Sequence, residues 1–172
     1  MNLNIRDAVT QDLPTLATLL LPADGTEKDR GRLEGQLAME LRREVTRMVA
    51  EVDGVLVGVI TVNKISGPPT RYLIHHRENP IGNFELGRLF VHPAYRRRGI
   101  GRALLGEVNY LGRILTALRP HETVAQFFLR SAGRVAHGRF NVPSGAVLVM
   151  AQRHTAWSKP LRTTEKIRAA AQ

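Results

Sequence analysis

The chain contains no cysteine among its 172 residues. A disulfide framework, a thiolate nucleophile and a zinc site with cysteine ligands are therefore excluded. It also lacks any run of about 18 apolar residues, the length that a membrane-spanning helix needs, and the stretch from Met1 to Asp7 lacks the apolar core of a signal peptide. We therefore expect a cytoplasmic protein that does not enter a membrane.

Acidic residues are scarce in the second half of the chain. Residues 85–172 hold 15 Lys or Arg and 4 Asp or Glu, whereas residues 1–84 hold 10 and 11, so the formal net charge of +10 lies entirely in the second half. This asymmetry indicates an anionic ligand or partner there, either a phosphate-bearing cofactor or nucleic acid. A solubilising surface is the alternative interpretation.

The remaining composition is that of an ordinary globular protein. The chain is 43% hydrophobic and 23% charged, and its length suits a single domain that buries most of its apolar surface. We predict one domain over residues 1–154, followed by a basic tail over residues 155–172.

The first half of the chain predicts a strand, two helices and a hairpin. Apolar residues alternate over 3–9, and a helix is expected to start at Thr10 or Asp12 with Pro14 in its first turn. A second amphipathic helix is predicted over 27–43. Over 46–62 the period changes to two on both sides of Asp53-Gly54, which predicts a β-hairpin. Residues 64–83, rich in proline and glycine, are predicted to form a long functional loop.

The second half predicts strands at 84–91, 114–118, 134–140 and 146–152. Helices are expected over about 101–111 and 122–132, with a short one near 163–171. The apolar spacing also allows the first of these helices to continue to Leu118, but Gly112 favours a break. The whole pattern predicts a mixed α/β fold.

The most informative stretch runs from Glu85 to Leu105. Its apolar strand stops at Pro93, which cannot donate to a β-ladder. Arginines and two glycines, Gly99 and Gly101, then lead directly into a helix. The first turn of a helix presents unpaired amides and positive potential, and glycines let a diphosphate approach them.

Arg96 to Gly101 reads Arg-Arg-Arg-Gly-Ile-Gly and resembles the acyl-CoA-binding signature of the GNAT acetyltransferase superfamily, Arg/Gln-x-x-Gly-x-Gly/Ala. The strand end from Leu89 to Pro93 is similar to that family's Leu-x-Val-x-Pro, and Ala125 to Gly133 looks like its later helix. The resemblance covers about residues 3–152. It implies a mostly antiparallel, splayed sheet flanked by helices, and transfer of an acetyl group from acetyl-CoA to a primary amine in a ternary complex.

The resemblance also implies where acetyl-CoA binds. Backbone groups of the motif strand would bond the pantetheine arm, and the arginine turn would hold the diphosphate. The expected cofactor-binding residues are Leu89, Phe90, Val91, Arg96, Arg97, Arg98, Gly99, Ile100, Gly101, Arg102 and Ala103.

The catalytic residues are less well indicated. The tyrosine that acts as an acid in many relatives falls on Leu129, which cannot donate a proton. Glu85, at the start of the motif strand, is the first candidate base, and His92 is the second because imidazole suits proton transfer near neutral pH. Glu122 and the phenols of Tyr72, Tyr95 and Tyr110 are further candidates, although Tyr95 is expected to pack beneath the arginine turn.

Other partners stay open at this point. His75 and His76 point to opposite sides of an extended chain and make poor joint metal ligands, even with Glu78 nearby, so no metal is expected. The basic tail with Trp157 fits nucleic acid or a dimer partner. A CoA-binding sensor without catalysis, or a basic nucleic-acid-binding module, are the alternatives to an enzyme, and the identity of the amine is not indicated.

Overall fold

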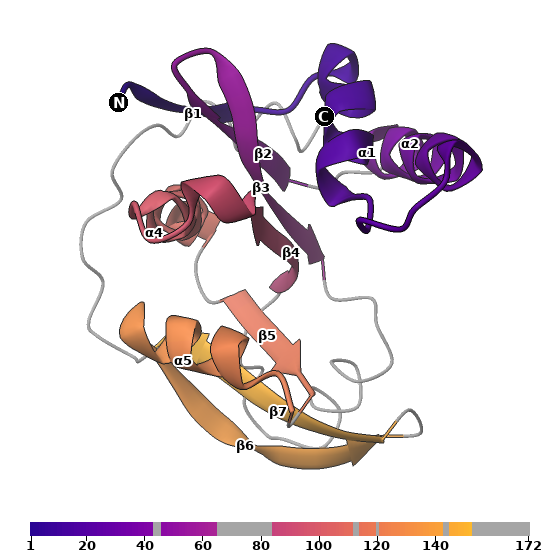
Figure 1. Cartoon of the computed structure of the whole chain (residues 1–172). Helices are drawn as coiled ribbons and strands as arrows, with labels where there is room; N and C mark the ends of the chain where they lie inside the picture. The colour runs from indigo at the N-terminus through magenta and orange to yellow at the C-terminus, as the bar shows by residue number, and fades with distance from the viewer. Residues whose placement is uncertain (43–45, 65–83, 112–113, 120, 143–144, 153–172) are drawn as a thin grey trace, which may run out of the picture. The chain divides into compact units, whose positions relative to one another are not determined.

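The computed structural model describes residues 1–42, 46–64, 84–111, 114–119, 121–142 and 145–152, with only the backbone for 135–152 (Figure 1). The predictions for the loop beyond Lys64 and for the tail lie outside these residues. The chain divides into two compact units, Met1–Lys64 with Leu86–Val108 and Ile65–Glu85 with Asn109–Gln172. The single domain over 1–154 stays a prediction.

The first unit is built on antiparallel strands. They are β1 (Leu3–Asp7), β2 (Thr46–Val52), β3 (Val55–Lys64) and β4 (Phe84–Val91), hydrogen-bonded in that order. Asp53 and Gly54 join β2 to β3 with φ angles of 50° and 81°, the conformation of a tight hairpin turn. The predicted hairpin is confirmed.

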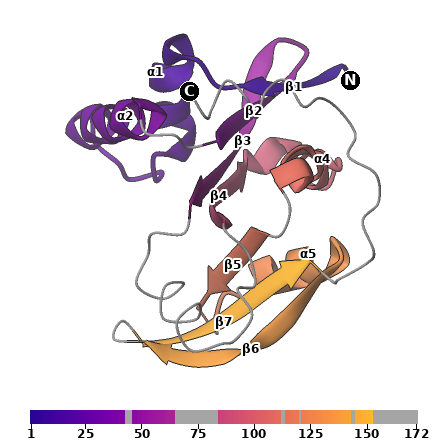
Figure 2. The ribbon, with the colours of Figure 1, turned by 180° about the vertical axis from the view of Figure 1, so that it is seen from behind.

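Helices cover both faces of this sheet (Figures 1 and 2). On one face, α1 (Leu13–Leu20) and α2 (Glu27–Arg42) pack on the paired residues Val49 and Val59. On the other face, Leu104 of α4 (Ile100–Glu107) lies against Gly58, where a Cβ atom would come within 3.2 Å of the leucine side chain. Neighbouring residues of β3 therefore contact different helices, as the alternation of a strand requires.

The prediction that the first strand reaches residue 9 was wrong. It ends at Asp7 because the Val9 amide donates to the carboxylate of Asp12, at 2.8 Å, and not to a neighbouring strand. The same carboxylate accepts two hydrogen bonds from Arg6, at 2.7 and 2.8 Å, and Arg6 also donates to Glu51 of β2. This ion-pair network joins β1, β2 and the start of α1.

The second unit contains the first residues of β4, β5 (Ile114–Leu118), α5 (Thr123–Ser131), β6 (Arg134–Val142) and β7 (Gly145–Gln152). Phe84 and Glu85 pair in parallel with Ile114 and Leu115, and β7 lies antiparallel between β5 and β6. The helix α5 covers one face of these strands, with Leu129 only 3% exposed (Figures 1 and 2).

The strand at 114–118 excludes a helix that continues to Leu118. The predicted end of the preceding helix at residue 111 was also wrong, because α4 stops at Glu107 and a short 3-10 turn covers Asn109–Leu111. The helical ladder ends where the amide of Val108 bonds the carbonyl of Gly106. Within the described residues, none of the helices combines the length and apolarity needed to cross a membrane.

Arg134 is a buried cation of the second unit that the sequence did not single out. It is 2% exposed, and its Nη1 donates to the carbonyl of Ile114 at 2.5 Å. Burial lowers the pKa of Arg134 to about 10. Its remaining guanidinium nitrogens have no hydrogen-bond partner within the described part of the chain.

Candidate functional site

The site begins where β4 ends. The amide of His92 makes a 2.8 Å hydrogen bond to the carbonyl of Val57 in β3, and Pro93 follows in a 3-10 turn, Pro93–Tyr95. The amides of Tyr95 and Arg96 close this turn by bonding the carbonyls of His92 and Pro93, at 2.9 and 3.2 Å. The chain is therefore fixed on both sides of the strand end.

Arg96 braces this turn against the strand. Its Nε donates to the carbonyl of Val91 at 2.9 Å, and its guanidinium carbon lies 5.8 Å from the ring centre of Phe90. The Val91 carbonyl thus already accepts one hydrogen bond from within the protein. These contacts fix the turn, and the predicted contribution of Arg96 to cofactor binding stays a prediction.

The next residues adopt a backbone conformation that suits an anion. Arg97 has a φ of 64° and Gly99 a φ of 81°, on either side of Arg98. A left-handed conformation is uncommon for arginine and costs about 1 kcal/mol or more, and such residues cluster at functional sites. In turns where right- and left-handed residues alternate, successive amides point toward one side and can hold an anion.

The start of α4 continues this turn. The first helical hydrogen bond runs from the amide of Ala103 to the carbonyl of Gly99, at 2.9 Å. By helix geometry the amides of Gly99, Ile100 and Gly101 have no acceptor within the helix. Arg97, Arg98 and Arg102 are exposed around them, and Gly99 carries no side chain that could cover them. Three exposed arginines and amides without a helical acceptor therefore belong to the same short segment.

Tyr95 lies under this turn, as the sequence predicted. The guanidinium carbon of Arg98 is 5.4 Å from the centre of the Tyr95 ring, and the rings of Tyr95 and His92 meet edge to face at 5.9 Å. The phenol is thereby part of the support for the arginine turn.

His92 is held in one tautomer. Its Nδ1 accepts a hydrogen bond from the amide of Ala94 at 3.3 Å, so the proton of the neutral imidazole is on Nε2. The role of His92 as a base stays a prediction.

The remaining candidates differ in their surroundings. Glu85 is half-buried near the start of β4, in register with Leu115 of β5. Glu122 is exposed, and its carboxylate accepts a 2.5 Å hydrogen bond from the amide of Arg119 just before α5. Leu129, at the position of the missing tyrosine, points into the core. Glu85 therefore stays the first candidate base.

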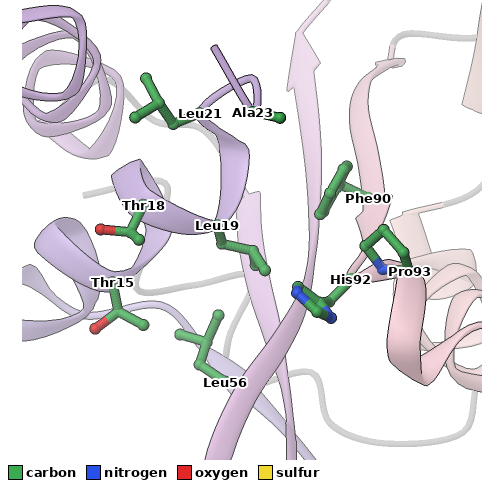
Figure 3. Close-up of a pocket in the computed structure, with 9 residues that line it drawn as sticks. All are labelled: Thr15, Thr18, Leu19, Leu21, Ala23, Leu56, Phe90, His92 and Pro93. Carbon is green, nitrogen blue, oxygen red and sulfur yellow. The ribbon is translucent and has the colours of Figure 1, made fainter. Parts of the chain in front are cut away.

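A cavity of about 450 Å³ opens beside the end of β4 (Figure 3). Thr15, Thr18 and Leu19 of α1 face Phe90, His92 and Pro93 across it, and Leu56 of β3 lies between them (Figure 3). Leu21 and Ala23 complete it from the segment between α1 and α2. The volume lies in the range of small-molecule pockets, and the lining is mostly apolar with few polar groups.

Sequence reasoning missed a charged cluster on the same side of β4. Arg47 of β2 and Arg88 of β4 both donate to Oε2 of Glu40 in α2, at 2.5 and 3.4 Å. Arg47 also donates to the carbonyl of Leu37 at 3.1 Å, and its side chain is 1% exposed. The only signal in the sequence is a charged residue at position 88, inside an otherwise apolar strand.

Within the described residues, no group of three or more His, Asp or Glu side chains comes close enough to hold a metal ion. His75, His76 and Glu78 lie outside the described residues, so the prediction made for them stays a prediction.

Known proteins resemble the chain in sequence pattern and in fold. A model of the Acetyltransferase (GNAT) family matches residues 12–113. A search of curated proteins finds no match. Among solved structures, the PaiA N-acetyltransferase of Thermoplasma acidophilum in complex with coenzyme A is similar with a TM-score of 0.66 and 18% identity, over 90% of this chain and all of the other.

Two further structures show the same likeness. The ribosomal-protein-alanine N-acetyltransferase of Brucella melitensis has a TM-score of 0.62 and 22% identity, over 87% of this chain and 98% of its own. The protein yncA of Salmonella typhimurium, solved with its cofactor acetyl-CoA, has a TM-score of 0.62 and 17% identity, over 95% of this chain and all of its own. Identities this low show the fold, which is the predicted mixed α/β acyltransferase fold.

Proposed function

Since the chain belongs to the GNAT acetyltransferase family, we propose that it transfers an acetyl group from acetyl-CoA to a primary amine. The observation that carries this proposal is the glycine-opened turn between β4 and α4. Its exposed amides and arginines match the chemistry of a diphosphate, which coenzyme A carries at one end.

The residues after β4 have distinct tasks in this proposal. Arg97, Arg98 and Arg102 supply charge around the diphosphate, and the amides of Gly99, Ile100 and Gly101 supply hydrogen bonds. Arg96 keeps the turn in place through Val91 and Phe90. Ala103 makes the first helical bond and so fixes the direction in which those amides point.

The pantetheine arm would run back from the diphosphate along Val91, Phe90 and Leu89. An extended arm pairs with a strand through backbone groups, so the side chains need not be specific. The thioester would then lie beyond Leu89, toward the start of β4. The acceptor must reach this end of the strand.

Direct attack requires a neutral amine, and Glu85 is the carboxylate that lies at the start of β4. We assign to it the removal of the amine proton, directly or through one water. The absence of an acid at Leu129 is tolerable, because thiols are far more acidic than alcohols, with a pKa of about 8.5 for the cysteine side chain, so a thiolate is a good leaving group without prior protonation. One of the similar structures described above is named as an acetyltransferase of a ribosomal-protein alanine. The family pattern itself does not indicate which amine this chain acetylates.

The experiment measures release of free thiol from acetyl-CoA over a panel of amines, together with thermal unfolding in acetyl-CoA. Ligand at about a hundred times its dissociation constant should stabilise the fold by roughly 2.7 kcal/mol. A shift with thiol release supports the enzyme, and a shift without release from any amine indicates a CoA-binding sensor. No shift at all overturns the proposal.

The role of Glu85 is tested by Glu85→Gln, with Glu107→Gln, an exposed carboxylate at the end of α4, as the matched control. Loss of turnover in the first variant alone, recovered in part at higher pH where more amine is neutral, is the result we expect. Unchanged turnover in Glu85→Gln removes Glu85 as the base.

A further inference from the structure

The acceptor side of β4 combines one excess positive charge with an apolar cavity. Arg88 contacts Glu40 of α2, and Phe90 packs with α1 and α2 and lines the cavity. Both side chains therefore project from the same face of β4. Two residues along a strand span about 7 Å, so Arg88 is the next position on this face of β4 after Phe90, which lines the cavity.

Arg88 is the cation of the cluster that can accept a further anion. Among the residues that the structure describes, the single carboxylate of Glu40 is shared by two arginines, so this cluster holds one more positive charge than negative. Arg47 holds Glu40 at 2.5 Å and is buried, while Arg88 lies 3.4 Å from the same oxygen with its side chain 33% exposed. An incoming carboxylate would meet a guanidinium that is held in place yet only weakly engaged.

Gly87, the residue before Arg88, lies against two polar side chains of β3. A Cβ atom at Gly87 would come within 2.7 Å of Nδ2 of Asn63 and 2.9 Å of Oγ1 of Thr61. The glycine is thus needed for these two side chains to lie against β4.

The cavity selects against charge. None of the nine residues that line it is acidic, and Leu19, Leu56 and Phe90 provide an apolar lining. A polyamine or another cationic group would find no counter-charge there, and burial of an unpaired charge is costly. An apolar side chain would be favoured by about 25 cal/mol per Å² of its buried surface.

We infer that the acceptor is an apolar α-amino acid, with its carboxylate bound by Arg88 and its side chain in the cavity beside Phe90. This inference rests on the proposed acetyl transfer. The α-amine lies between the two groups in such a molecule, and so faces the part of β4 where the thioester would arrive. The amine nitrogen forms the new bond to the acetyl carbon, the bond from that carbon to sulfur breaks, and the amine proton leaves to the base.

The first test compares leucine with leucinamide as acceptors of the unmodified protein. The amide lacks the negative charge, and its amine is less basic and so more available as the neutral nucleophile. We expect kcat/KM to be at least tenfold higher for leucine, against this chemical trend. Equal or better use of leucinamide overturns the inference, while it leaves the proposed acetyl transfer intact.

The second test uses Arg88→Gln, with Arg42→Gln, an exposed arginine at the end of α2, as the matched control. Arg88→Gln should raise KM for leucine at least tenfold, with no change for leucinamide and no change in acetyl-CoA affinity. An equal loss for both acceptors indicates a structural role only, and contradicts the inference. Thermal unfolding of both variants verifies that they fold.

The third test fills the cavity with Thr18→Trp and compares leucine with alanine. The preference for leucine over alanine should fall at least fivefold, because the larger side chain loses its place and the smaller one does not need it. An unchanged preference places the side chain elsewhere and overturns this part of the inference. Absence of thiol release with every amine would instead remove the proposed function itself.

Discussion

Arginines occupy two contrasting environments in this protein. Arg6 and Arg47 are held by carboxylates within the fold, through Asp12 and Glu51 in one case and Glu40 in the other. Arg97 and Arg98 lie exposed at a turn whose backbone points amides outward. The same side chain therefore stabilises the fold where carboxylates surround it, and is available to a ligand where they are lacking.

The pKa directions express this difference. The hydrogen bond to Asp12, followed by that to Glu51, raises the pKa of Arg6, and the hydrogen bond from Arg6 lowers the pKa of Asp12. Burial lowers the pKa of Arg47, with Glu40 acting in the opposite direction. Asp12, Glu40 and Glu51 are thus engaged in the fold by these two arginines.

The largest expected effect is the loss of Arg6. Arg6→Met leaves Asp12, which is 8% exposed, and Glu51 without their cation, and should lower the free energy of unfolding by about 3 kcal/mol. Arg97→Met, the matched change at the exposed turn, should alter it by less than about 0.5 kcal/mol. Urea unfolding measures both. Equal losses would erase the distinction between the two environments.

Acid should weaken the Arg6 network next. Because the pKa of Asp12 is lowered in the folded state, its contribution to stability is present above its unfolded pKa, about 4, and is lost as the pH falls through the folded value. The unfolding free energy should therefore drop below about pH 4, and drop less in Arg6→Met. Parallel pH curves for the two proteins would contradict this assignment.

Removal of a turn arginine should affect the ligand and not the fold. Arg98→Met is expected to weaken acetyl-CoA binding about tenfold, which corresponds to the loss of one charge-assisted hydrogen bond. Its thermal unfolding without ligand should stay within a degree or two of the parent protein. Titration calorimetry gives the affinity, and an unchanged value would place the diphosphate away from Arg98.

The smallest effect is expected at the strained position of the turn. Arg97→Gly relieves a left-handed φ of 64°, and should raise the unfolding free energy by up to about 1 kcal/mol while it lowers acetyl-CoA affinity. Opposite signs of the two changes would show that strain is retained for binding. A loss of stability would indicate that the Arg97 side chain supports the turn.

Local signals in the sequence predicted most of the elements. The strands at 84–91 and 114–118 were placed correctly, because Pro93 and Gly112 mark positions where pairing or helix cannot continue. The strand end at Asp7 was misplaced, since the Asp12 side chain competes for the amide of Val9. A contact of this kind depends on a side-chain orientation that apolar alternation does not record.

The site was predicted in part for the same reason. The arginine turn is contiguous in the chain, so its chemistry was visible in one motif. The pairing of Glu40 with Arg88 joins residues 48 positions apart, and the cavity is assembled from α1, the segment after it, β3 and β4. Such sites exist only after the helices pack on the sheet, and no short pattern indicates them.

The central claim is that the amides at the start of α4 receive the diphosphate of acetyl-CoA. Isothermal titration with acetyl-CoA should compare Gly101→Asp with Gly106→Asp, which adds the same charge at an exposed position of the same helix where a Cβ atom meets nothing within 4 Å. Affinity should fall at least a hundredfold in Gly101→Asp and change less than threefold in Gly106→Asp. Retained affinity in Gly101→Asp would contradict the account.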